Sequence, residues 1–260
     1  MAHEQSFTPQ PLESFDSLSD FVLVTCEHGG NRVPAAYKPL FRRHQQLLNS
    51  HRGYDPGSLE LGRACARRLK APLHFATVTR LLVELNRSIR HRSLFSVVTR
   101  SLGPAERETL LEKYYWPHLR KVEAEMAGAI AAGRRVLHFS MHTFTPQLDG
   151  QVRNADVGLL YDPRRSGEVE ICAELRRDLG LRRPDLAVRM NYPYQGKADG
   201  LTTTLRKKWN AAAYVGIEIE VSQKWPLGSN RRAWRRLVRD LASTIESTVA
   251  QQPARGQRSR

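Results

Sequence analysis

Short apolar runs alternate with longer amphipathic stretches along this chain. Apolar runs bounded by polar or turn-forming residues are typical of buried strands, and apolar residues that recur every three or four positions are typical of helices packed against a sheet. The alternation predicts an α/β fold: a single-domain mixed, largely parallel sheet flanked by helices. The expected strands are 21–26, 73–77, 81–85, 136–141, 157–161, 187–191 and 214–221.

The expected helices follow from apolar spacing and from helix-breaking residues. Leu59, Ala66 and Leu69 recur at helical spacing after an Asp-Pro start, and Pro117 divides a long amphipathic stretch because proline cannot continue a helix interior. No internal repeat or linker separates two units, so one domain is expected over 1–260, with disordered ends at 1–12 and 253–260. The expected helices are 56–70, 104–133 with a division at Pro117, 167–179 and 232–249.

Composition limits the partners, the redox compartment and the membrane association that this protein can be expected to have. Lysine and arginine number 41 against 26 acidic residues, and the resulting net charge of +15 favours an anionic partner or substrate. Three cysteines without CxxC spacing exclude a disulfide framework and a thiolate zinc site. The N-terminus has no signal-peptide pattern, and no apolar run approaches the roughly 20 residues that would span a bilayer. A cytoplasmic protein that is not inserted in a membrane is therefore expected.

Polar residues stand where strands end, and ligands of open α/β sheets bind at that edge. His28 follows the first apolar run within CEHGGN, where two glycines allow a tight turn; it is either a metal ligand or a turn histidine. Asp55 precedes Pro56, a pattern typical of a helix N-cap and first helical residue, although a carboxylate can also bind a metal. His51 is a weaker ligand candidate from the same segment.

Two later strands carry further candidates. His142 falls at the end of the run 136–141 and is the better ligand, whereas His138 is expected on a strand face. Glu218 and Glu220 share one face of an apolar strand, where two carboxylates are costly to bury without a compensating cation or proton. The alternative is an edge strand with a solvated acidic face.

Together, two histidines, an aspartate and a spare glutamate from separate segments are what a catalytic zinc site requires: three protein ligands, an open position and a carboxylate base. The sequence contains no HExxH, GxSxG, GxxxxGK[ST] or strand-following GxGxxG motif. The usual signatures of helix-borne zincins, serine hydrolases, P-loop proteins and dinucleotide-binding proteins are thus missing. Cys26 is expected to be packed rather than nucleophilic because it completes an apolar strand.

At this point the sequence resembles a known family, the N-formylglutamate amidohydrolases, over about residues 20–225. There is a more distant likeness to zinc carboxypeptidases, succinylglutamate desuccinylase and zinc N-acetylmuramoyl-alanine amidases. The motifs that carry the resemblance are CEHGGNRVP at 26–34, YDPGSLELG at 54–62, LLVELNRSIRHRSLFS at 81–96, HFSMHTFTP at 138–146, VRNADVGLLYDP at 152–163, NYPYQGKADGLTTTLR at 191–206 and GIEIEVSQ at 216–223.

The resemblance implies a phosphorylase/hydrolase-like, zinc-exopeptidase-like fold and one divalent metal, Zn²⁺, bound by His28, Asp55 and His142. It also implies Glu220 as the catalytic base in preference to Glu218, because relatives that resemble the true deformylase carry a neutral amide at the earlier position. The deformylases of histidine degradation typically have PHSG at the first histidine, whereas this chain has Glu27 and two glycines there. The sequence therefore resembles a sister branch, whose substrate stays open.

A small anionic N-acyl amino acid as substrate calls for guanidinium groups that can bind carboxylates bidentately. Asn86 and Arg87, directly after the expected strand 81–85, are the best placed, and related carboxypeptidases use a similar Asn-Arg pair for a substrate carboxylate. Further substrate-binding candidates are Arg153, Arg206 and Asn191, the last of which opens the motif NYPYQG.

Two alternative functions stay open. A peptidoglycan or peptide amidase would share the metal site but usually requires export. A nucleic-acid-binding protein is the rival from another class, because residues 231–260 hold eight arginines and two acids, a net of +6, together with Trp234. The same stretch fits the solvated face of a terminal helix, so nucleic acid is the less favoured partner. The oligomeric state does not follow from the sequence.

Overall fold

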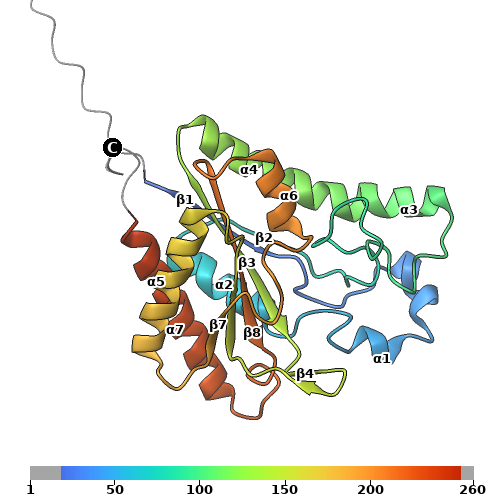
Figure 1. Ribbon diagram of the computed structural model, residues 1–260. Coiled ribbons are helices and arrows are strands. Elements are labelled where there is room, and N and C mark those ends of the chain that lie inside the picture. Colours follow the sequence, from blue (N-terminus) through green and yellow to red (C-terminus); the bar gives the residue numbers. More distant parts are fainter. Residues whose placement is uncertain (1–18, 253–260) are drawn as a thin grey trace, which may run out of the picture.

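The computed structural model describes residues 19–252 and shows a six-stranded mixed sheet between two layers of helices (Figure 1). The strand order is β2-β1-β3-β8-β6-β7, in which β2, β1, β3 and β8 run parallel and β6 runs antiparallel to β8. The fold class predicted from the sequence is confirmed. The strands are β1 (Phe21–Cys26), β2 (Leu73–Phe75), β3 (Val136–Phe144), β6 (Val157–Leu160), β7 (Val188–Met190) and β8 (Tyr214–Ser222), and a separate hairpin is formed by β4 (Gln147–Leu148) and β5 (Gln151–Val152).

Helices cover both faces of the sheet. Helices α2, α5 and α7 pack together on one face, over the apolar cluster that contains Phe139, Ile217 and Trp234. Helices α4 and α6 cover the other face, where Leu23 and Tyr214 are buried. The helices are η1 (Ala35–Phe41), α1 (Gln45–Leu48), α2 (Ser58–Leu69), α3 (Pro104–Leu110), η2 (Leu111–Tyr115), α4 (Trp116–Ala131), α5 (Ser166–Arg182), α6 (Leu201–Lys208) and α7 (Arg231–Ala250).

One predicted strand is wrong. Residues 81–85 form tight turns, although their apolar side chains are buried as the pattern indicated. Their backbone groups bond within the same region: Glu84 N–H donates to Leu94 O, and Ser96 Oγ–H donates to Leu81 O. No helix or strand interrupts residues 76–103, which we call the irregular segment. Its apolar side chains form two clusters beside the sheet. Phe41 and Leu110, from neighbouring elements, are members of one of these clusters.

The predicted division of residues 104–133 takes an unexpected form. Helices α3 and α4 follow one another end to end, and the π-helical turn η2 joins them (Figure 1). The backbone N–H of Trp116 bonds to Leu111 O, five residues back, just before Pro117 would interrupt the helical bonding. Tyr115, at the end of this turn, donates its hydroxyl hydrogen to Arg87 O at 2.9 Å. The turn therefore ties this helix to the irregular segment.

Helix α7 carries the arginine-rich stretch. Trp234 is fully buried in the core, while the neighbouring Arg232, Arg235 and Arg236 are exposed. This arrangement matches the solvated helix face, and it removes Trp234 as a base-stacking residue. The expected disordered ends, 1–12 and 253–260, lie outside the described residues. Within 19–252, no helix combines the length and the apolar character needed to cross a bilayer.

Candidate metal centre and active site

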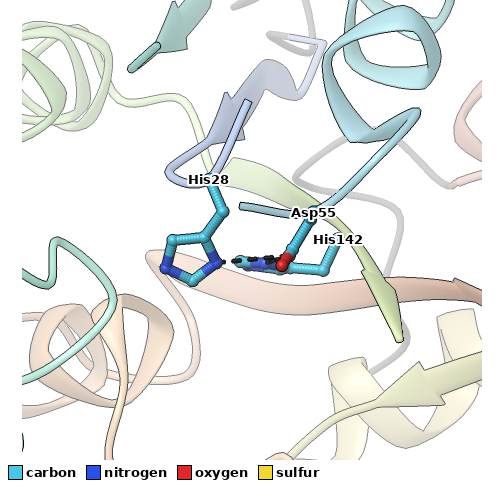
Figure 2. A group of neighbouring side chains, drawn as sticks. All are labelled: His28, Asp55 and His142. Carbon is cyan, nitrogen blue, oxygen red and sulfur yellow. Dashed lines mark hydrogen bonds and ion pairs between the residues drawn. The ribbon is translucent and has the colours of Figure 1, made fainter. Parts of the chain in front are cut away.

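Two histidines and an aspartate converge at the carboxyl ends of the parallel strands (Figure 2). His28 lies in the turn after β1, His142 near the end of β3, and Asp55 in the turn before α2. Asp55 Oδ2 lies 3.2 Å from His28 Nδ1 and 3.1 Å from His142 Nδ1. The three candidate ligand atoms lie within 4.8 Å of one another, and all three residues are at most 5% exposed. Three residues from separate segments of the sequence therefore lie together in the fold.

The chemistry of this cluster fits a divalent metal. Two imidazole nitrogens and one carboxylate oxygen form a donor set that zinc accepts in catalytic sites. Asp55 does not cap α2, whose N-cap is the left-handed Gly57. Burial alone would raise the pKa of Asp55, but His28, His142 and Arg80 hold that pKa well below its usual range. The carboxylate is therefore ionised and able to bind a cation.

Each imidazole has a second buried carboxylate on its far side. His28 Nε2 contacts Glu84 Oε1, and His142 Nε2 lies 3.1 Å from Glu27 Oε2. Ser140 adds a hydroxyl 2.9 Å from His142 Nε2 and donates to Glu27 Oε2 at 2.7 Å. Carboxylates on the outer nitrogens fix the tautomer and orientation of metal-binding histidines. Both Nδ1 atoms are accordingly turned toward Asp55.

Arg80 links these carboxylates on the side of the irregular segment. Its guanidinium donates to Glu84 Oε2 at 2.6 Å and to Asp55 Oδ1 at 3.2 Å. Burial would raise the pKa of Glu84, but Arg80 and His28 hold it well below its usual value. Glu84 therefore stays ionised between a guanidinium and an imidazole.

Glu218 and Glu220 lie side by side on one face of β8, and Glu220 pairs in register with His142. The strand is central, with β3 and β6 on either side, so the solvated acidic edge considered from the sequence is wrong. Glu218 Oε1 accepts a hydrogen bond from Thr202 Oγ1 at 2.7 Å. Glu220 Oε2 is buried with no partner among residues 19–252, and burial raises the pKa of Glu220 to about 8.

A cavity of about 480 Å³ opens above these groups. We call the five residues at its base the cavity floor: His28, Asp55, His142, Glu218 and Glu220. The irregular segment forms much of one wall, with Arg80, Glu84 and Arg92 among its lining residues. A water molecule and a small substrate can thus reach the metal cluster and both carboxylates of β8 from the same space.

Asn86 and Arg87 line this cavity, as predicted, although they follow a turn instead of a strand. Asn86 Oδ1 accepts from Leu201 N–H at 2.6 Å, and its Nδ2 lies 3.4 Å from His142 Nε2. Arg87 Nη1 donates to the backbone carbonyls of Asn86 and Asp199 at 2.9 and 2.8 Å. These bonds hold the guanidinium in place and leave its other N–H groups available.

The remaining candidates lie elsewhere. Arg153 is not part of the lining, but its guanidinium stacks on Tyr194, which is, at 4.9 Å from the ring centroid. Arg206 donates two hydrogen bonds to the carboxylate of Glu168 and one to Gly216 O, and it does not line the cavity. Asn191 shapes its own turn, because its Oδ1 accepts from Tyr161 N–H and Gly196 N–H.

Three less favoured candidates are also placed by the structure. His51 is exposed and lines the cavity but is not a member of the metal cluster. His138 is a strand-face residue, hydrogen-bonded to Thr25 Oγ1 and Tyr214 Oη at 2.8 Å each. Cys26 is buried, and burial raises the pKa of its thiol to about 12, so a nucleophilic thiolate is disfavoured there.

Sequence reasoning missed Glu27, Glu84 and Arg80. Two of them carried a signal: Glu27 directly precedes His28, and Glu84 interrupts the apolar run LLVEL. A single carboxylate within a buried run needs a partner. The sequence could not say that the partners would be the two imidazoles of the metal cluster.

Comparison with known proteins identifies the family of this chain. The model of the N-formylglutamate amidohydrolase family matches residues 21–225. The chain therefore belongs to this family of amidohydrolases. No curated protein sequence matches it.

Two solved structures are similar along nearly the whole chain. The gene product Atu2144 from Agrobacterium tumefaciens is 26% identical, covering 89% of this chain and 91% of its own, with a TM-score of 0.75. An N-formylglutamate amidohydrolase from Ralstonia eutropha JMP134 is 20% identical, covering 89% of this chain and 94% of its own, with a TM-score of 0.67. The second likeness shows a shared fold.

Proposed function

We propose that this protein is a metal-dependent hydrolase that cleaves the amide bond of N-acylated amino acids, with N-formylglutamate or a close relative as substrate. The observation that carries the proposal is the convergence of His28, Asp55 and His142 beside Glu220, whose buried Oε2 has no partner among residues 19–252. Family membership supports amide hydrolysis as the reaction. We propose Zn²⁺ as the ion, because two imidazoles and a carboxylate suit it, although manganese, iron or nickel can use the same ligands.

Glu220 supplies the proton transfer in this proposal. A zinc ion held by the cluster would polarise the acyl carbonyl and lower the pKa of a water molecule toward about 7. Glu220 accepts the proton of that water at its free Oε2 and delivers it to the leaving nitrogen. A general base works best when its pKa lies near the working pH, and burial raises the pKa of Glu220 in that direction. Glu218, bonded to Thr202, is the less available carboxylate.

Arg87 holds a substrate carboxylate in this proposal. One of its terminal nitrogens is fixed by two backbone carbonyls, so the rest of the guanidinium can present a planar edge to the cavity. Arg153 can assist from the mouth through Tyr194, to whose hydroxyl it donates at 3.0 Å. The three cysteines are buried and form no disulfide, which is consistent with our further proposal of a reducing, cytoplasmic setting.

The test combines metal analysis with an assay of glutamate release. Protein stripped with a chelator and reloaded with zinc, manganese, iron or nickel should bind one ion per chain and hydrolyse N-formylglutamate only when loaded. Asp55→Asn should lose the ion and the activity together. Asp162→Asn is the matched control, because Asp162 is an equally buried carboxylate that pairs with Arg164 outside the cavity. Failure of every loaded form to hydrolyse N-formyl amino acids would overturn the proposal.

A further inference from the structure

The arginines that line the cavity form two tiers. The inner tier, Arg80 and Arg87, is half-buried: Arg80 donates to Asp55 and Glu84, and one terminal nitrogen of Arg87 donates to backbone carbonyls. The outer tier consists of three exposed residues whose guanidinium groups make no hydrogen bond or ion pair with any residue of 19–252. They are Arg52, Arg92 and Arg100.

The acids of the same cavity lie deeper. Four of them are buried. Asp55 belongs to the metal cluster, Glu84 contacts His28 of that cluster, and Glu218 and Glu220 lie on β8. The remaining lining acid, Asp199, accepts from the backbone N–H of Ser88. Positive charge is therefore concentrated at the mouth and is not cancelled there by acidic side chains. Such a separation orients an anionic ligand as it enters a cleft.

The lining of the cavity is partly apolar. It includes Phe95, Leu148 and Tyr194, together with Val97, which is 42% exposed. A cavity of about 480 Å³ is typical of ligands of drug size, which are larger than a formylated amino acid. The cavity can therefore hold an aliphatic linker between a group at the floor and a charge at the mouth.

We infer that the substrate continues beyond its first amino acid and carries a second residue with an anionic group, held by Arg92 and Arg100 and assisted by Arg52. The inference rests on the proposed function, because amide hydrolysis at the floor directs the leaving amine, and everything attached to it, toward the mouth. The shared chemistry is an anion that a guanidinium fork can bind, either a carboxylate or a phosphate. Acidic N-acyl dipeptides are the class that fits this layout.

The experiment compares three C-terminally amidated substrates that differ only in the side chain of the second residue: N-formyl-Glu-Glu amide, N-formyl-Glu-phosphoserine amide and N-formyl-Glu-Gln amide. In zinc-loaded protein at low salt, kcat/KM for at least one of the two anionic dipeptides should exceed that for the glutamine dipeptide by about tenfold, as expected for one charge-assisted contact. The larger of the two values identifies carboxylate or phosphate as the preferred anion. Because the outer tier is exposed, the preference should fall steeply with added salt.

Variants assign the preference to the outer tier. The double variant Arg92→Gln/Arg100→Gln should bring the ratio of anionic to neutral dipeptide close to one. Arg90→Gln is the matched control: Arg90 is exposed on the same irregular segment but does not line the cavity, so its ratio should stay at the wild-type value. Equal kcat/KM for all three dipeptides in the wild type, or a ratio that the double variant leaves unchanged, would overturn the inference.

The design separates this inference from the proposed function. If N-formylglutamate is hydrolysed but the dipeptides show no preference, the inference fails and the proposed function stands. If no substrate is hydrolysed, the proposed function fails, and calorimetric binding of the same three dipeptides then decides the inference. Tighter binding of an anionic dipeptide that is lost in the double variant supports it, and equal affinities overturn it.

Discussion

The cavity floor and the irregular segment beside it are built in different ways. On the floor, His142, Glu218 and Glu220 are placed by the register between β3 and β8, nine residue pairs long. On the wall, Arg80, Glu84 and their neighbours are held mainly by side-chain contacts and turns. Backbone ladders give the floor fixed positions at the end of a rigid sheet, whereas loops carried by a scaffold accept change more readily. Under the proposed function, this difference implies a division of labour: chemistry on the floor and substrate choice on the wall.

The largest expected effect tests the floor. Glu220→Gln should keep the bound metal and lose about 100- to 10,000-fold in kcat, because the amide preserves shape but cannot accept the proton. Metal content and turnover are measured on the same preparation. Glu218→Gln is the companion variant, with a smaller expected loss because Glu218 already bonds to Thr202. The reverse order of the two losses would assign the base to Glu218.

The next prediction compares the two carboxylates that contact the Nε2 atoms of His28 and His142. Glu27 directly follows β1, and Glu84 lies on the irregular segment. Glu84→Gln and Glu27→Gln should each lower metal affinity by about 10- to 100-fold, measured with a competing chelator. The loss should be greater for Glu84→Gln, because Ser140 still contacts His142 when Glu27 is changed. Glu125→Gln removes a contact with His74, which neither lines the cavity nor belongs to the cluster, and serves as control. Unchanged metal affinity in both variants would show that the outer carboxylates do not position the imidazoles.

A smaller effect tests the wall. Arg87→Lys retains the charge but loses the planar fork, so KM for N-formylglutamate should rise about tenfold with little change in kcat or metal content. Comparing N-formylglutamate with N-formylglutamine shows whether Arg87 binds the side-chain carboxylate. A substrate without the α-carboxylate covers the other possibility. Indifference of wild type and variant to both carboxylates would contradict a role for Arg87 in binding.

The last prediction concerns the stability of the protein at acid pH and tests His138 on β3, the strand that also carries His142. Burial lowers the pKa of His138 to about 4, below the usual 6.5, so the folded state favours the neutral ring. The associated stability is complete above pH 6.5 and is lost as the pH falls toward 4. Between pH 7.5 and 4.5, wild type should lose roughly 2 kcal/mol more unfolding free energy than His138→Gln, measured in urea. Parallel losses in the two proteins would contradict this assignment.

The sequence predicted the floor better than the wall, for a physical reason. Strand runs and the polar residues after them pointed to His28 and His142, because parallel strands bring their carboxyl ends to one edge. Asp55 was found instead at the Asp-Pro start of a helix. His142 nonetheless lies inside β3, which extends to Phe144 because β8 pairs with it that far. The run 81–85 has the composition of a buried strand, and burial alone does not distinguish a strand from a buried turn. Contacts such as Glu84 to His28 depend on that turn and could not be predicted.

The π-helical turn η2 gives the helix over 104–131 a length that evolution can change. Such a turn corresponds to one extra residue within an α-helix, and its wider turn absorbs that residue without the rotation of about 100° that an insertion into a regular helix would cause. Leu110 therefore packs with Leu81 and Val98 on the irregular segment, while Tyr115 at the end of the turn still bonds to Arg87 O on the same segment. The helix can thus gain or lose one residue at this turn while the wall, and with it His28, Asp55 and His142, keeps its place.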